Sequence, residues 1–454
     1  MLYVFLCHSQ DIHRTACQGK IDRLDSLLQS TDLHAQDDQG RSLLHWAVGC
    51  NQHEVFAHLV ALGIDINWED REGNTALYVA VQFDRDSLFD QLIELQADQS
   101  WIAKEGAQLL ERAILDQRLS YVKKLVNLGV ELEVTNAWGS TPLVIAARIG
   151  ADEIATWLRE QGADESKIQA LTMKGPYMGQ QPPGLNRAVF APNFISIEQY
   201  EFGSVFSKDG TEFFYAVALG NKPIVRYSKL IEGVWSQPET ILSHDKYGFN
   251  DPFLSPDESR LYFISKRNME GTDAKEDHDI WYVERQSSGW SEPINAGTNI
   301  NSSDNEYYIS FTTDGTMYFA SNVNAEGDTK QSNQDIYYAP FVDGEFQKAV
   351  RLPDEINTAA YEADVFVDPE EAYLIFCSRR AEGFGRGDMY ISFKDENGSW
   401  TQATNMGNLV NTEYHELCPF VTADGKYLFY TSNQDIYWVG AEVIEQLRKE
   451  AFSE

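Results

Sequence analysis

Short stretches in which hydrophobic and polar residues alternate fill the C-terminal two thirds of this chain. The clearest example is residues 415–438, where two such stretches flank Asp424 and Gly425 and a third begins at Asp435. Alternation with a period of two predicts half-buried β-strands. The Asp-Gly pair predicts a tight hairpin turn, because glycine accepts positive φ without steric cost. A ribbon of three strands leaves an unpaired edge, so this unit needs neighbouring strands.

Four degenerate copies of this unit precede it. Each copy has two strands around a turn, a third strand, and then a short segment (GVWSQP, GWSEP, GEFQKA or GSWTQA) that we interpret as a fourth strand. The turn residues are 48 to 57 positions apart: Asp209, Asp257, Asp314, Glu370 and Asp424. The pattern resembles the TolB-type, WD-like β-propeller repeat over about 174–440. This resemblance implies an all-β propeller with five blades; six are possible only if the chain hides another copy.

The last copy lacks an outer strand of its own, because residues 441–454 have a helical pattern. Arg187–Ser196 (RAVFAPNFIS) resembles Lys348–Asn357 (KAVRLPDEIN), which follows the third strand of another copy. We therefore expect residues 187–196 to supply the missing strand and to close the ring, which removes its open edge.

The N-terminal third has a different period. Four glycines lie 33 residues apart, and each is followed by a short apolar helix pattern: Gly40, Gly73, Gly106 and Gly139. Thr141-Pro142-Leu143 and Ser42-Leu43-Leu44-His45 resemble the ankyrin motif. The resemblance implies an α-solenoid that binds a protein partner on its concave face, with His45 as a structural hydrogen-bonding residue. We predict a degenerate cap and four repeats over residues 1–165, a linker at 166–186, the propeller at 187–440 and a C-terminal helix at 441–454.

Composition narrows the possible partners and compartments. The formal net charge of -34 argues against nucleic acid and anionic membranes, which require clustered Lys and Arg. Five cysteines without CxxC spacing predict neither a disulfide framework nor a zinc site: Cys7, Cys17, Cys50, Cys377 and Cys418. Without a signal peptide or a membrane span, we expect a cytoplasmic protein, or a periplasmic one only if a signal peptide is missing from this start.

One set of acidic residues recurs at a fixed place in the copies. A glutamate stands eight residues before the turn position in four copies, and the second copy has an aspartate two positions further on: Glu201, Glu306, Glu362, Glu416 and Asp251. First strands line the channel of a propeller, so we expect these acids near one channel mouth. They would either accept structural hydrogen bonds or bind a cation, a second protein or a small ligand.

The pattern favours a non-catalytic interaction scaffold, for which we predict no catalytic residue, no metal and no cofactor. One alternative is a propeller hydrolase or lyase, with His415 beside Glu416 as the acid/base pair to test. Another is a propeller that binds glycans or small ligands through stacking tryptophans: Trp281, Trp290, Trp400 and Trp438. The glycine-rich segment 383–387 and the acidic segment 273–279 are interpreted as a flexible connection and a solvated loop.

Overall fold

The structure is a computed structural model, which describes residues 11–99, 102–136, 139–168, 172–197, 199–218, 222–269, 273–323 and 333–452. The chain divides into two compact units, residues 1–169 and 170–454. Each unit has a hydrophobic core of its own. No helix among the described residues is long and apolar enough to cross a membrane.

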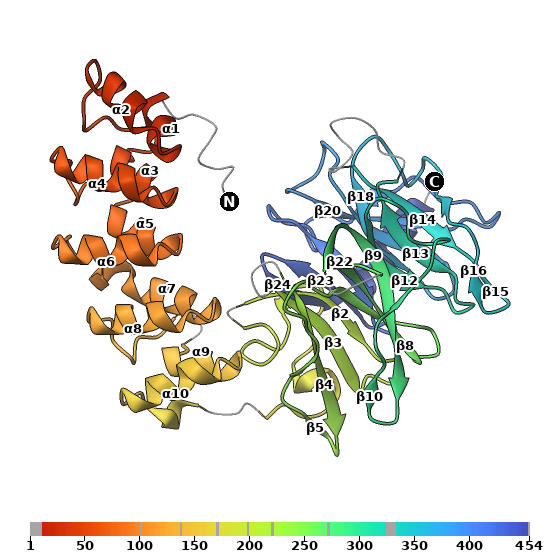
Figure 1. Cartoon of the computed structure of the whole chain (residues 1–454). Helices are drawn as coiled ribbons and strands as arrows, with labels where there is room; N and C mark the ends of the chain where they lie inside the picture. Colours follow the sequence, from red (N-terminus) through yellow and green to blue (C-terminus); the bar gives the residue numbers. More distant parts are fainter. Residues whose placement is uncertain are drawn as a thin grey trace. The chain divides into compact units, whose positions relative to one another are not determined.

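The first unit is a stack of paired helices, and its described residues contain five pairs (Figure 1). In order along the chain they are α1 (Asp11–Cys17) with α2 (Ile21–Leu28), α3 (Leu43–Gly49) with α4 (His53–Ala61), α5 (Ala76–Gln82) with α6 (Asp86–Glu94), α7 (Ile102–Leu115) with α8 (Leu119–Asn127), and α9 (Pro142–Arg148) with α10 (Asp152–Glu160). The first helices of the pairs contact one another from α1 to α3 to α5 and from α7 to α9. Stacked repeats of this kind bury a continuous core that no single pair could form.

Polar residues at the helix starts join one repeat to the next. The His45 ring contacts Ser42 Oγ at 2.8 Å through Nδ1 and the Asn74 carbonyl at 2.9 Å through Nε2. Thr75 and Thr141 cap α5 and α9 by accepting backbone N–H groups. The structural role predicted for His45 is therefore confirmed.

The 33-residue glycine pattern holds at three of its four positions. Gly40, Gly73 and Gly139 have φ between 76° and 85°, in the left-handed region that glycine favours. Gly106 instead lies inside α7, and a Cβ there would approach Val130 Cγ2 to 2.8 Å. The prediction that Gly106 precedes its helix was wrong: this glycine allows close packing within the helix pair.

The cysteine prediction was also wrong. Cys17 and Cys50 form a disulfide across 33 residues, joining the end of α1 to the C-cap of α3. The two cysteines occupy equivalent ends of neighbouring repeats, so stacking brings together residues that spacing alone does not pair. Cys377 and Cys418 are free and buried, and Cys7 lies outside the described residues. A disulfide is typical of proteins in oxidising environments, where such bonds persist.

Replacing Cys17 and Cys50 together by serine should lower the free energy of unfolding of the helical unit by about 3 to 4 kcal/mol, because a closed loop of this length restricts the unfolded chain. Urea unfolding followed by far-ultraviolet circular dichroism measures the change. Reductant should destabilise the wild type and leave the double variant unchanged. Equal sensitivity of the two proteins to reductant would contradict the prediction.

The described residues of the second unit form five antiparallel sheets of four or five strands, the blades of a five-bladed propeller, and one separate two-stranded ribbon (Figure 1). From the innermost strand outward, the first blade is β2 (Tyr200–Phe206), β3 (Glu212–Ala218), β4 (Ile224–Ile231) and β6 (Glu239–Leu242), and the second is β7 (Asn250–Leu254), β8 (Arg260–Arg267), β9 (Ala274–Gln286) and β11 (Ile294–Asn295). The third blade is β12 (Glu306–Phe311), β13 (Met317–Ser321), β14 (Asp335–Ala339) and β17 (Val350–Arg351), and the fourth is β18 (Glu362–Val367), β19 (Tyr373–Ser378), β20 (Asp388–Phe393) and β21 (Thr404–Asn405). The fifth is β22 (Leu417–Val421), β23 (Tyr427–Ser432), β24 (Asp435–Gly440) and β1 (Ala188–Val189). The first strands contact one another in a closed circle, β2 to β7 to β12 to β18 to β22 and back to β2.

The fifth blade takes its outer strand from the beginning of the unit. Ala188 pairs with Trp438 and Val189 with Tyr437, so the strand expected within residues 187–196 is present but only two residues long. Phe190, next to it, packs its ring against Phe429 and Trp438, with centroids 4.9 and 5.5 Å away. Closure therefore combines a short strand pair with a buried aromatic cluster. Helix α11 (Glu442–Ala451) follows and buries Val443 and Ile444.

Two details of the blades differ from the sequence interpretation. The Gly-aromatic segments form only short ribbons, β5 (Val234–Trp235), β10 (Gly289–Trp290) and β16 (Glu345–Phe346), the last paired with β15 (Phe341–Val342). The outer blade strands β6, β11, β17 and β21 follow after them. Residues 274–279, expected in a solvated loop, belong to the long strand β9. Within this strand, the Lys275 ammonium forms salt bridges with Asp277 and Asp279, at 2.7 and 2.6 Å.

Candidate functional site

The four recurrent glutamates begin, or lie just before or within, the first strands of their blades, and all four are fully buried. Glu306 shows the arrangement: its carboxylate accepts the Ser302 N–H at 3.1 Å, the Ser302 hydroxyl at 2.6 Å and the Ser321 hydroxyl at 3.0 Å. Glu362 makes the same three contacts with Thr358 and Ser378. Each carboxylate therefore joins its own blade to the connection that arrives from the preceding blade.

Glu416 and Glu201 occupy the corresponding places in blades five and one. Glu416 accepts from the Thr412 N–H, the Thr412 hydroxyl and the Ser432 hydroxyl, at 3.2, 2.5 and 2.7 Å. Glu201 accepts the N–H of Ile197 at 3.4 Å. In the second blade, Phe249 stands at this position and is buried among Tyr247 and Phe263.

An asparagine completes this connection and was missed in the sequence. Asn357 accepts the Ile336 N–H at 2.7 Å and donates to the Ile336 carbonyl at 2.9 Å, which ties it to the third strand of the preceding blade. Asn301 and Asn411 make the same pair of contacts with Ile280 and Met389. The three connections share a sequence motif that could have revealed it. The motif is Ile or Val, then Asn, then Ser or Thr, then any three residues and Glu, and it occurs at residues 300–306, 356–362 and 410–416.

Burial dominates the electrostatics of Glu306 and Glu362. It raises the pKa of Glu306 to about 7, although the Ser302 and Ser321 hydrogen bonds act in the opposite direction. Burial also raises the pKa of Glu362 against the contacts with Thr358 and Ser378. The carboxylates of Glu306 and Glu362 are thus hydrogen-bonded to neighbouring groups of the protein, as buried polar groups generally are.

Asp251 lies on a different ring, two positions further along the first strand. The equivalent residues of the blades are Gly203, Asp251, Tyr308, Asp364 and Cys418, and all five have positive φ, between 45° and 57°. Each first strand has a register shift at this point, so each residue belongs to a β-bulge. Gly203 is required here for a second reason: a Cβ would lie 2.9 Å from Asp251 Cα.

Asp251 and Asp364 are two acids of this bulge ring that influence each other. Burial raises the pKa of Asp251 to about 6, and the Cys418 thiol lies 3.3 Å from its Oδ1. Burial and the charge of Asp251 raise the pKa of Asp364 to about 8, against the effect of Arg379. Asp364 was not singled out in the sequence, although aligning the copies two positions after Glu362 and Phe249 would have shown it beside Asp251. The described residues hold no cluster of three or more His, Cys, Asp or Glu side chains suited to a metal ion.

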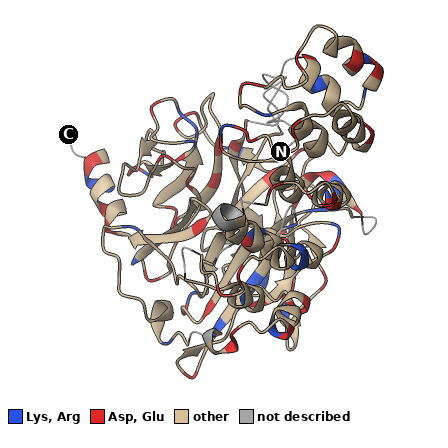
Figure 2. Cartoon of the chain, turned by 90° about the vertical axis from the view of Figure 1, so that its left-hand side faces the viewer, with Lys and Arg blue, Asp and Glu red and all other residues tan. Residues whose placement is uncertain are grey.

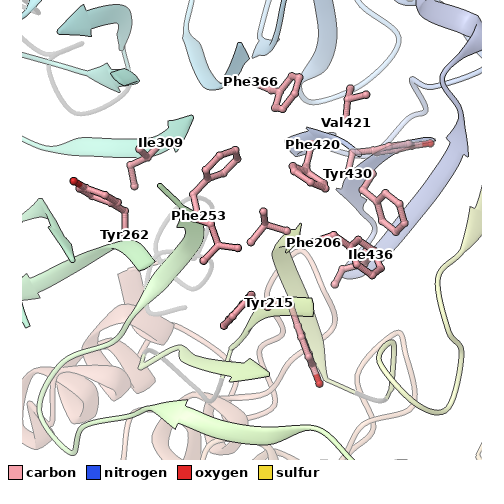
Figure 3. Close-up of a cluster of buried hydrophobic side chains, with 14 of the residues drawn as sticks. Phe206, Tyr215, Phe253, Tyr262, Ile309, Phe366, Phe420, Val421, Tyr430 and Ile436 are labelled. Atoms are coloured by element: carbon pink, nitrogen blue, oxygen red, sulfur yellow. The ribbon is translucent and has the colours of Figure 1, made fainter. Parts of the chain in front are cut away.

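Phenylalanines line the channel on the side of the hairpin turns, around an apolar pocket of about 90 Å³. Phe253, Phe366 and Phe420 come from three different first strands and point toward one another (Figure 3). Phe420 lies 6.0 Å from both Phe253 and Phe366 between ring centroids, and all three side chains are buried. This packing favours access to the bulge ring from the other end of the first strands.

At that other end is a polar pocket with a volume of about 390 Å³. Its lining residues are Tyr200, Arg379, Arg386, His415, Leu417, Thr431, Asn433 and Gln434. Burial and the charges of Arg379 and Arg386 lower the pKa of His415 to about 4, so its imidazole is neutral at neutral pH. Sequence reasoning found His415 but neither arginine.

The structure does not bring His415 and Glu416 together as an acid/base pair. His415 Nε2 lies 3.2 Å from Cys377 Sγ, whereas the Glu416 carboxylate contacts Thr412 and Ser432. Neighbouring residues entering a strand point in opposite directions, which explains the separation.

The four tryptophans proposed as stacking platforms pack against the protein itself. Trp281 and Trp438 are buried in the propeller core. The Arg285 guanidinium lies over Trp290 at 4.7 Å, and Lys394 over Trp400 at 5.1 Å. Ring faces that are already covered favour a packing role.

Comparison with known proteins identifies one part of the chain. Residues 12–102 match the model of ankyrin repeats, in three copies. No curated protein matches the chain. The helix pairs up to α10 continue the same architecture beyond the matched residues. The molecule therefore combines an ankyrin-repeat stack with a five-bladed propeller, a class of protein built from binding repeats.

Replacing Glu362 by Gln should destabilise the propeller by about 1 to 3 kcal/mol, because an amide NH₂ would face groups that donate to the carboxylate. Urea unfolding followed by tryptophan fluorescence measures the change, and Glu382→Gln, an exposed glutamate of the same blade, is the control. Millimolar Ca²⁺ or Mg²⁺ should leave the wild-type melting temperature unchanged. A rise that Glu362→Gln abolishes would indicate a cation site instead.

Asp364 should make the stability of the propeller depend on pH. Its pKa is raised from 3.8 to about 8 in the folded state, which therefore holds the proton more tightly than the unfolded chain. The stabilisation is present at low pH and is lost as the pH rises from about 4 to 8. Asp364→Asn removes this titration and should exceed the wild type in stability by up to about 6 kcal/mol above pH 8.

Urea unfolding at a series of pH values tests the effect of Asp364. The exposed Asp343, which also has positive φ, provides the control Asp343→Asn. Parallel pH profiles for the wild type and Asp364→Asn would contradict the expected linkage.

Proposed function

We propose that this chain is a non-catalytic interaction protein whose ankyrin stack binds a protein partner on its concave face, with a second binding surface on the propeller. The observation that carries the proposal is the ankyrin stack itself, a repeat architecture that generally mediates protein–protein interactions. Its buried polar side chains His45, Thr75 and Thr141 serve the contacts between and within repeats. Exposed residues near the hairpin tips, such as Asp38 and Glu69, face solvent.

Charge indicates the kind of partner. The chain carries 70 acidic and 36 basic residues, and acidic side chains occur on both the helices and the propeller (Figure 2). A basic protein surface would be attracted to such a molecule and would bind more weakly as salt increases. We therefore propose a protein partner with a basic surface for the ankyrin face, rather than nucleic acid or an anionic membrane.

For the propeller, we infer a repeat of the TolB-type, WD-like kind from the five copies of strand, turn, strand and strand. The hydrolase or lyase alternative is less well supported, because the recurrent glutamates are engaged in contacts within their blades. A cytoplasmic location stays a prediction, and the Cys17–Cys50 disulfide favours an oxidising compartment instead.

Charge reversal at the hairpin tips tests the proposed ankyrin face. Full-length protein carrying Asp38→Lys and Glu69→Lys should lose the partner that wild-type protein captures from a lysate, as identified by mass spectrometry. The matched control is Glu94→Lys on the second helix of a repeat, α6, which is also exposed. An unchanged set of partners in the double variant would contradict a concave-face site.

A further inference from the structure

The glycine-rich segment 383–387 has a fixed place beside the polar pocket. The Arg386 N–H donates to the Tyr414 carbonyl at 2.8 Å, and the Glu416 N–H donates to the Gly387 carbonyl at 2.9 Å. At its start, the N–H groups of Phe384 and Gly385 donate to Asp388, at 2.6 and 3.0 Å. The segment is thus held along the strand entrance of the fifth blade, and its interpretation as a flexible connection was wrong.

Its glycines permit this close approach. A Cβ at position 385 would collide with the carbonyl oxygens of Thr412 and Tyr414, and one at position 387 would collide with the His415 ring. Only a residue without a side chain allows two backbones to approach so closely. The effect is to hold the backbone of Arg386 next to His415.

Arg379 reaches the same pocket from the end of β19. Its guanidinium lies 4.4 Å from the centroid of the Tyr361 ring, and the backbone N–H of Arg379 donates to the Tyr361 carbonyl. The charges of Arg379 and Arg386 both lower the pKa of His415, which indicates that they act on one region. Two positive charges in one pocket repel each other unless an anion lies between them.

Neither guanidinium group forms a hydrogen bond or salt bridge with any residue that the structure describes. In contrast, Arg285 and Arg351 of the same propeller pair with Glu212 and Asp335. The pocket lining contains no carboxylate. Arg379 and Arg386 are exposed, and the acids that act on this region, Asp364 and Asp388, lie outside the lining. In a chain with nearly twice as many acidic as basic residues, the pocket lining thus brings two cations together without an acid of its own.

The remaining lining groups suit a polar ligand. Tyr200, Thr431, Asn433 and Gln434 supply hydroxyl and amide groups that both donate and accept hydrogen bonds. The volume of about 390 Å³ lies within the range of small-molecule sites. Arginine binds carboxylate and phosphate oxygens in a bidentate manner, and so matches an oxyanion better than any other side chain.

We propose that this pocket binds a small hydroxylated ligand carrying an oxyanion, a carboxylate or a phosphate, between Arg379 and Arg386. The ligand differs in charge from the cation that was one of the possible partners of the channel-mouth acids. All its lining residues belong to the propeller unit.

Isothermal titration calorimetry with the full-length protein tests this site, using glucuronate, glucose 6-phosphate and glucose as probes. At least one of the two anions should bind, and neutral glucose should bind at least tenfold more weakly. Preference between the anions distinguishes a carboxylate from a phosphate ligand. Arg379→Ala and Arg386→Ala should each weaken binding at least tenfold. Arg448→Ala, an exposed arginine of α11 outside the pocket, should bind as the wild type does.

Failure of both anions to bind, or equal binding by glucose, would overturn the proposal. If an arginine variant fails to fold, the wild-type protein supplies a second measurement. The His415 ring resonances in nuclear magnetic resonance spectra should shift on addition of the binding anion and not on addition of glucose. Absence of that shift would also overturn the assignment.

Discussion

The ring depends on how each blade is attached to the one before it. A buried carboxylate at the start of the first strand accepts an N–H and a hydroxyl from the arriving connection and a second hydroxyl from its own blade, as Glu306 does with Ser302 and Ser321. An adjacent asparagine, such as Asn301, bonds both backbone groups of one residue in the preceding blade. The full network holds the third, fourth and fifth blades, and because buried polar groups are costly when unpaired, it fixes how each of these first strands lies against the preceding blade.

The same constraint shapes the channel. Fixed first strands carry a bulge at one level, and five residues with positive φ meet there. Phenylalanines narrow the channel on the side of the turns to a small apolar pocket, while Tyr200, Arg379 and Arg386 line a polar pocket at the other end. The buried glutamates and the two arginines thus occupy neighbouring positions. The glutamates recur in four blades, and Arg379 has a basic counterpart only in Lys266 of the second blade among the described residues.

The ankyrin unit does not have to close into a ring, because each repeat contacts only its neighbours. Its polar residues extend a capping contact into the next repeat, as His45 does with Asn74. The disulfide between Cys17 and Cys50 follows the same principle, since it joins equivalent helix ends of consecutive pairs. Stability in this unit comes from neighbouring repeats, whereas the propeller needs its last strand pair to complete the circle.

The sequence by itself determined the two repeat architectures, the five blades and the contribution of residues near 187–190 to the last blade. Periodic hydrophobicity and turn residues are local properties, and repetition multiplies their signal. It also found Asp251 and the four glutamates. Only the tertiary structure decided that Glu362 bonds within its blade, that Asp364 lies near Asp251, that Cys17 meets Cys50 and that Arg379 and Arg386 share a pocket. These outcomes depend on side-chain direction and on contacts between residues distant in the chain, which hydrophobic spacing does not encode.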